Sequence, residues 1–199
     1  MPADAKSDSF QQDFDKWLAE TVGISRAFQD SLDRDDDWTF VIKLHAMVEL
    51  ALTHLVLSRL PESAKLEKII SNLDLNDKRK GKIAFIRAFG LLPDNAILFV
   101  QKLCELRNIA VHGLKRFNLD LAIYFKGLEN KERGNWRNAI TTFSVSRLTR
   151  AQIDLALAHP RSTLHACCIS IMIRSWYGRP GWASRMYQSL IRERSPRQD

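Results

Sequence analysis

One segment near the middle of the chain places side chains of chemical interest close together. Arg107, Asn108 and His112 lie in the run CELRNIAVHG. Histidine exchanges a proton near neutral pH, and arginine binds anions through a planar fork of donors. The run is therefore either a catalytic set or the polar end of a buried helix, in which Arg107 and His112 cap the last carbonyls.

The helix that would carry these side chains extends from Asn95 to His112. At about 100° per residue, its apolar side chains form one stripe that should face the core. That stripe consists of Phe99, Leu103, Leu106 and Ala110. Asn108 and His112 lie nearly opposite the stripe. Arg107 and His112 are about 140° apart on an ideal helix, so they meet only if the last turn unwinds or a second chain completes the site.

The other elements are predicted to be mainly helical, because glycines and prolines are few (8 and 6). The longest helix should cover 38–60, with acidic caps before it in the run DRDDDW and Pro61 after it. Further helices are predicted at 9–32, 64–73, 77–89, 149–160, 161–178 and 181–194. Residues 118–128 fit either a helix or a strand, and residues 140–145 have a β-like pattern.

This pattern predicts an all-α fold in three segments. Residues 1–34 would form an acidic N-terminal helix that packs on a helical bundle. Residues 35–128 would form the bundle itself. Residues 129–199 would form a basic C-terminal helical extension.

The run LRNIAVHG, at the end of a helix that follows GKIAFIRAFGLLPDNAILFVQKLCE, resembles the signature of the HEPN superfamily. In that superfamily an Arg, usually followed by a polar residue, precedes a His by four to six positions. The pattern is most similar to small bacterial HEPN proteins of the mannitol-repressor-like type. The resemblance covers roughly residues 36–115 and implies an all-α, HEPN-like bundle that forms a homodimer, here through the helix Asn95–His112.

The resemblance also implies an activity, metal-independent endoribonuclease chemistry without a cofactor. His112 would take the proton from a ribose 2′-hydroxyl, and Arg107 would stabilise the charge on the scissile phosphate. Asn108 would orient the phosphate or hold His112 in one tautomer. RNA is then the expected ligand, the product is a 2′,3′-cyclic phosphate, and a toxin-like or defence enzyme could have an inhibitory protein partner.

Two readings without catalysis stay open at this stage. The chain could be a transcriptional regulator or a binding module for RNA or protein that keeps the motif for packing. It could also bind nucleic acid mainly through its basic C-terminal helices.

Other residues could support a site. His45 and Glu49, four apart on the long helix, could pair and reach toward Arg107, or form an ordinary buried contact, whereas His54 should lie on the surface. Two basic groups could bind nucleic acid. They are Lys78, Arg79, Lys80 and Lys82 at a predicted helix start, and Arg174, Arg179 and Arg185 among the aromatic residues of the C-terminal segment. A solvated loop and a buried aromatic cluster are the alternatives.

Composition restricts the class of protein. The net charge of +7 is uneven, with 10 acidic and 4 basic side chains in residues 1–40 but 12 basic and 4 acidic in 131–199. Three cysteines with no ligand-like spacing, read as reduced thiols, indicate a cytoplasmic protein. The longest apolar run, HACCISIMI, is too short to span a bilayer. No metal site is predicted, because His159 and His165 have no third ligand nearby.

Overall fold

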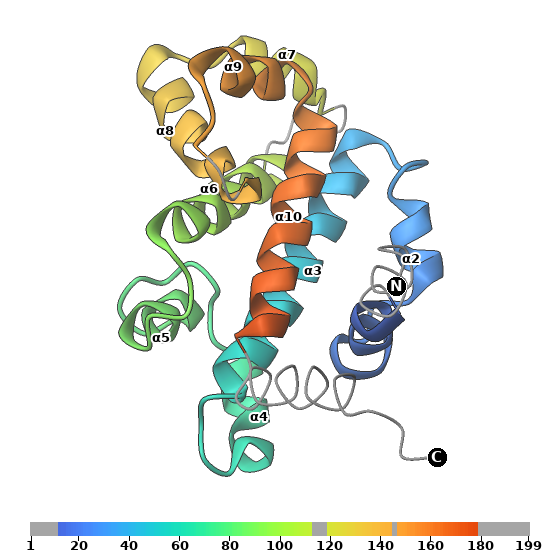
Figure 1. Ribbon diagram of the computed structural model, residues 1–199, viewed down its shortest axis with the longest axis vertical. Coiled ribbons are helices and arrows are strands. Elements are labelled where there is room, and N and C mark those ends of the chain that lie inside the picture. Colours follow the sequence, from blue (N-terminus) through green and yellow to red (C-terminus); the bar gives the residue numbers. More distant parts are fainter. Residues whose placement is uncertain (1–11, 113–118, 145–146, 179–199) are drawn as a thin grey trace, which may run out of the picture.

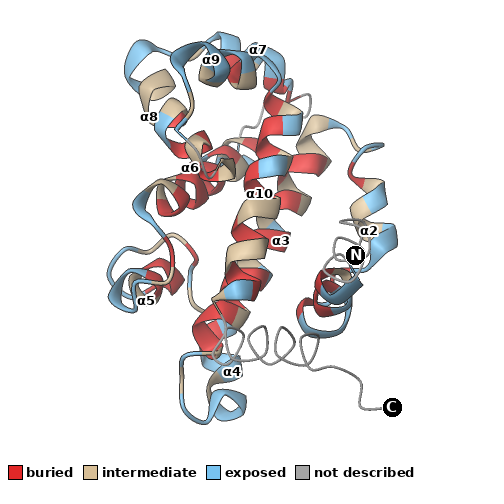
Figure 2. Cartoon of the chain, in the orientation of Figure 1, coloured by how far each residue is buried: buried red, intermediate tan, exposed pale blue. Residues whose placement is uncertain are grey.

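Two long helices form the centre of the molecule. The computed structural model describes residues 12–112, 119–144 and 147–178. Helices α3 (Asp37–Leu57) and α10 (Pro160–Tyr177) lie side by side and run in the same direction (Figure 1). Arg161 binds Asp37 where both helices begin, and Arg59 donates to the carbonyl of Gly178 where both end. Their buried faces form the middle of the core (Figure 2).

Helix α3 begins as the acidic run predicts and ends earlier than expected. The carboxylate of Asp36 accepts a hydrogen bond from the backbone N–H of Thr39 at 2.8 Å, and this bond holds the pKa of Asp36 below its usual value. After Leu57 the chain forms turns, in which the N–H of Leu60 donates to the carbonyl of Leu57. The turns lead to α4 (Ser63–Ser71).

Helix α6 (Asp94–His112) runs antiparallel to α3. The indole N–H of Trp38, at the start of α3, donates to the carbonyl of Ala110, at the end of α6, at 2.9 Å. The short helix α5 (Lys82–Ala88) packs against α3 and precedes α6. It begins at Lys82 and not at Asp77 as predicted, because the residues between them belong to a hydrogen-bonded loop.

Three further helices lie toward the end of the molecule where α3 and α10 begin, and a 3₁₀ turn that packs against the second half of α10 connects the last two of them (Figure 1). They are α7 (Leu121–Lys126), α8 (Asn130–Ile140), the 3₁₀ turn η2 (Thr141–Phe143) and α9 (Arg150–Ala158). Trp136 of α8 is fully buried between the rings of Phe99 and Phe125, with centroids 6.5 and 4.9 Å away. One aromatic side chain thus joins α6, α7 and α8.

The N-terminal segment contains two helices where one was predicted. Residues 12–22 are helical and end in the π-helical turn η1 (Leu18–Val22). Gly23 then adopts φ 79°, a left-handed conformation that favours glycine and stops the helix. Ser25 caps the next helix, α2 (Arg26–Ser31). Phe14 packs against Trp176 of α10, with ring centroids 5.7 Å apart.

The all-α prediction is confirmed, since the described residues contain no strand. The β-like interpretation of 140–145 is wrong, because α8 continues to Ile140 and η2 follows; residue 145 lies outside the described residues. The ambiguous segment 118–128 contains helix α7, and the helices predicted at 149–160 and 161–178 are α9 and α10. The helix predicted at 181–194 lies outside the described residues.

The three predicted segments share one core. A single hydrophobic cluster includes Trp17, Leu52, Phe99, Trp136 and Met172. The described part of the C-terminal segment supplies the central helix α10. Sequence patterning could not show this, because α10 is the partner of α3 across more than a hundred residues of chain.

One described helix, α3, is long and apolar enough to cross a membrane by length and composition alone. Uninterrupted apolar runs do not reveal it, because polar residues such as Lys43, His45 and Glu49 interrupt the helix. Of the apolar 18-residue stretch of this helix, 61% is buried inside the protein. The central position of α3 explains its apolar composition.

Candidate functional site

The last two turns of α6 present the predicted catalytic residues. Phe99, Leu103, Leu106 and Ala110 are buried, which confirms the predicted core stripe. Asn108 and His112 are exposed, and Arg107 is partly exposed. The predicted orientation of the motif is therefore confirmed. Gly113, the expected helix stop, lies outside the described residues.

The three motif residues do not form one compact group within a chain. Arg107 Nη1 donates to Asn108 Oδ1 at 3.1 Å. The side chain of His112 has no hydrogen bond or ion pair with any residue that the structure describes. The carbonyl of Ala110, in the last turn of α6, is instead capped by Trp38. No capping contact of Arg107 or His112 is thus present among the described residues.

A polar cluster lies behind Arg107, between α3 and α6. His45 Nδ1 is 3.8 Å from Glu49 Oε2, and His45 Nε2 is 3.5 Å from Cys104 Sγ. Burial lowers the pKa of His45, the Glu49 carboxylate opposes this shift, and the Arg107 guanidinium adds to it. Burial also raises the pKa of the Cys104 thiol to about 12. His45 is therefore largely neutral at pH 7, and Cys104 remains a thiol.

Lys82 belongs to this cluster and not to a nucleic-acid surface. Its side chain is only 1% exposed, and its Nζ lies 2.7 Å from Glu49 Oε1 and 3.1 Å from the carbonyl of Ser71. The prediction that Lys82 binds nucleic acid is wrong, because its charge is already paired inside the protein. Helix periodicity does not indicate this pairing, because Glu49 is on a different helix.

The other three cations of that group are exposed, as expected for an interaction surface or a solvated loop. Lys78, Arg79 and Lys80 lie in the loop before α5. Asp77 Oδ1 accepts hydrogen bonds from the backbone N–H groups of Arg79 and Lys80 at 2.8 and 3.1 Å. The loop therefore has a defined backbone that holds these side chains at the surface.

The second predicted basic group is only partly described. Arg174 is partly buried and donates to the carbonyl of Thr142 at 3.5 Å, so it packs against η2. Trp176 is buried and Tyr177 is exposed. Trp176 is therefore part of a buried aromatic cluster, which was the alternative to a nucleic-acid surface. Arg179 and Arg185 lie outside the described residues.

His54, on α3, is more buried than expected. His54 is partly buried, and that burial lowers its pKa, which the charge of Glu67 opposes. The prediction of a purely surface residue is wrong. Its position next to the end of α3 brings α4 and its Glu67 close, which helix periodicity alone does not reveal.

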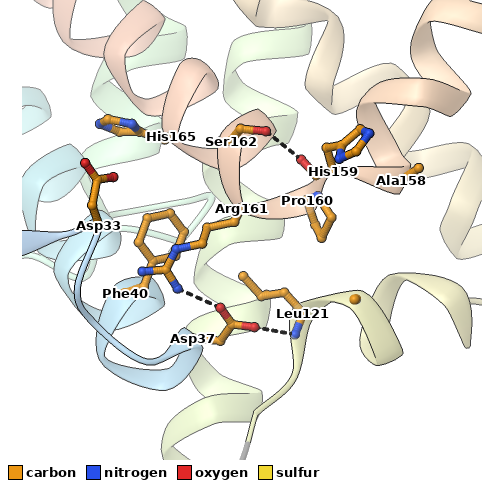
Figure 3. A pocket seen from close by; sticks show the side chains of 11 residues that line it. Asp33, Asp37, Phe40, Leu121, Ala158, His159, Pro160, Arg161, Ser162 and His165 are labelled. Atoms are coloured by element: carbon orange, nitrogen blue, oxygen red, sulfur yellow. Dashed lines mark hydrogen bonds and ion pairs between the residues drawn. The ribbon is translucent and has the colours of Figure 1, made fainter.

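A pocket of about 480 Å³ lies where α3 and α10 begin (Figure 3). Arg161 dominates it: the guanidinium lies 4.2 Å from the ring centroid of Phe40, binds Asp37 at 2.7 Å and donates to the carbonyl of Asp35 at 2.6 Å. A further bond goes to the carbonyl of Leu32. These contacts satisfy the charge of Arg161, so we interpret it as a clamp between helices.

Two contacts were not predicted from the sequence, those of Arg161 with the start of α3 and that of Cys104 with His45. For Arg161 a signal existed, because a cation in the first turn of a helix is unfavourable unless carboxylates neutralise it, and the run DRDDD supplies carboxylates. For Cys104 no signal existed. In the described residues, no group of three or more His, Cys, Asp or Glu side chains is arranged to hold a metal ion.

Comparison of the chain with protein-family models, curated proteins and solved structures gives no match. The functional argument therefore depends on the residues and contacts described above.

Proposed function

We propose that this protein is a HEPN-like, metal-independent endoribonuclease that uses Arg107, Asn108 and His112. One observation carries the proposal: Trp38 caps the end of α6, while neither Arg107 nor His112 caps a carbonyl among the described residues. Arg107 and His112 cap no carbonyl of the described residues, so these side chains and Asn108 are available for a ligand.

The residue types suit cleavage by the neighbouring 2′-hydroxyl. His112 takes the 2′ proton as the 2′-oxygen attacks phosphorus, and the bond to the 5′-oxygen breaks. An acid protonates that leaving oxygen, which gives a 2′,3′-cyclic phosphate and a free 5′-hydroxyl. Arg107 donates to the phosphate oxygens, where negative charge accumulates in the transition state. Asn108 fixes the guanidinium of Arg107 through their 3.1 Å hydrogen bond.

The proposed site is completed by a second copy of the chain. Arg107 and His112 do not contact each other within one chain, and the reaction needs both a base and an acid. Most of α6 before Glu105 is buried within the chain, so a partner can approach only the last two turns. The exposed side chains there are Glu105, Asn108, Val111 and His112. Two such surfaces, related by a two-fold axis, would bring two motifs together.

Cleavage of labelled single-stranded RNA in excess EDTA tests the proposal. Wild type should cut and leave cyclic phosphate ends, and His112→Ala and Arg107→Ala should each lose about 10²-fold or more of the rate. Matched controls are His159→Ala, an exposed histidine between α9 and α10, and Arg150→Ala, whose side chain is 82% exposed. Both controls should keep full activity.

Two results would overturn the proposal. One is the absence of cleavage by wild type at a concentration that forms the dimer. The other is an equal loss of activity in the control variants. If wild type binds RNA without cutting it, the non-catalytic binding module becomes the better description of the chain.

A further inference from the structure

Two aromatic side chains lie next to each other at the end of α5, Phe85 in its last turns and Phe89 at its C-cap. The ring centroids of Phe85 and Phe89 are 6.3 Å apart, with 36° between their planes. Phe85 is partly buried against the core, whereas Phe89 is 46% exposed. An exposed ring of this size loses favourable burial unless a ligand covers it.

The carboxylates of the loop that precedes α5 accept hydrogen bonds from the backbone of the same loop, while its cations point to the surface. Asp74 Oδ1 accepts the backbone N–H groups of Asn76 and Asp77 at 2.7 and 2.8 Å. Asp77 in turn accepts those of the two residues at the tip, as described above. A Cβ on Gly81 would lie 2.2 Å from the carbonyl oxygen of Asp74, so only glycine fits there. The loop is therefore a built structure with a closely packed base.

The exposed charges in the loop before α5 are mainly positive. Lys78, Arg79 and Lys80 are exposed there, within about ten residues of Phe89 in the chain. The two carboxylates of the loop are engaged by backbone N–H groups, and Lys82, the first residue of α5, is paired with Glu49. Exposed cations and an exposed aromatic ring within one short segment are a combination that binds single-stranded nucleic acid.

We propose that the loop before α5 and the exposed ring of Phe89 at the end of α5 bind single-stranded nucleic acid, with an unpaired base stacked on Phe89 and phosphates bound by Lys78, Arg79 and Lys80. The ligand is single-stranded because bases in a duplex are stacked on each other and cannot reach a phenyl ring. Charge complementarity with the phosphates favours a nucleic acid over an apolar protein partner.

This surface lies close to the proposed active site. Lys82, the first residue of α5, pairs with Glu49, and the second carboxylate oxygen of Glu49 lies 3.8 Å from His45 Nδ1. The guanidinium of Arg107 is near enough to help lower the pKa of His45. The α5 surface and the end of α6 are thus joined through one polar cluster. The statement that this surface holds the substrate of the ribonuclease rests on the proposed function; the binding itself does not.

Binding of an oligonucleotide that cannot be cleaved separates the two proposals. The probe is a labelled single-stranded DNA of about 12 nucleotides, which lacks the 2′-hydroxyl, compared with the same sequence as a duplex. The full chain is titrated by fluorescence anisotropy at several salt concentrations. We expect tighter binding of the single strand, and a roughly 5- to 100-fold weaker Kd for Phe89→Ala.

Three variants sharpen the test. Phe89→Trp should retain or improve affinity, because its ring also stacks. Arg79→Gln should weaken binding and reduce the slope of log Kd against log salt by about 0.7, the value for one lost phosphate contact on a single strand. Ile123→Ala removes an apolar side chain that is 70% exposed on α7 and should leave Kd unchanged.

Each outcome assigns the failure to one proposal. Phe89-dependent binding without RNA cleavage would refute the ribonuclease and support this surface. If Phe89→Ala changes neither the rate of RNA cleavage nor the Kd for single-stranded DNA, the proposed binding surface is refuted and the ribonuclease proposal stands. Equal affinity for the duplex, or binding that does not respond to salt, would overturn the inference as well.

Discussion

The buried ammonium of Lys82 provides a quantitative test of how the polar cluster is held together. Its Nζ is shielded from water, with Glu49 Oε1 at 2.7 Å and the Ser71 carbonyl at 3.1 Å. Lys82→Met keeps most of the aliphatic chain that packs in the core and removes the charge. What is lost is therefore the ion pair and one hydrogen bond to a backbone carbonyl.

The expected cost follows from the exposure of the two partners. Breaking a fully buried pair costs about 3–5 kcal/mol, because the remaining charge has no partner. Glu49 is 34% exposed, so water can partly solvate its carboxylate, and we expect about 2–3 kcal/mol for Lys82→Met. In a protein of this size that corresponds to a fall in Tm of about 4–12 °C.

Thermal and urea unfolding of Lys82→Met, Glu49→Gln and the double variant measure the cost. Glu49→Gln should cost more than Lys82→Met, because it leaves the fully buried ammonium without a counter-charge. The double variant should be about 1–3 kcal/mol more stable than the sum of the single effects. Lys65→Met, in a pair whose lysine is 76% exposed, is the control and should change stability by less than about 0.5 kcal/mol. Additive single effects would refute the reasoning.

Three further outcomes can be measured by unfolding. Asp36→Ala should cost about 1 kcal/mol, while Asp36→Asn keeps most of the cap. Trp136→Ala should cost about 3–5 kcal/mol in one cooperative transition; a separate transition of 129–178 would contradict the single core. Burial lowers the pKa values of His45, His54 and His165, so the unfolded chain binds more protons. Stability should be full above about pH 7 and fall as the pH drops below about 6.5; a pH-independent Tm between about 7.5 and 5 would contradict this.

The features that sequence predicted well are local. The core stripe of α6 and the orientation of Asn108 and His112 follow from helix periodicity alone. The N-cap at Asp36 follows from the preference of aspartate for that position. The all-α class follows from the same periodicity, summed over several helices. None of these requires knowledge of which helices are neighbours.

The features that sequence missed depend on contacts between distant segments. Lys82 looked like a surface cation at a helix start, but the Asp74–Gly81 loop delays the start of α5 and turns Lys82 toward Glu49. The clamp made by Arg161 joins two segments that are 124 residues apart. A charge pattern shows which residues are cations, whereas burial and pairing depend on tertiary neighbours.

The cap at the end of α6 makes function and stability separable in this protein. A helix end leaves several carbonyls without partners, and a polar motif there usually serves to satisfy them. Here the indole of Trp38 takes the Ala110 carbonyl, so truncating the exposed side chain of His112 removes no contact that the described residues provide. Trp38→Phe should therefore destabilise the protein. His112→Ala should leave Tm unchanged within about 1 °C, which corresponds to about 0.3 kcal/mol. Such a contrast would show that the fold does not need the side chain of His112, so that a loss of RNA cleavage in His112→Ala could be read as a loss of chemistry and not of folding.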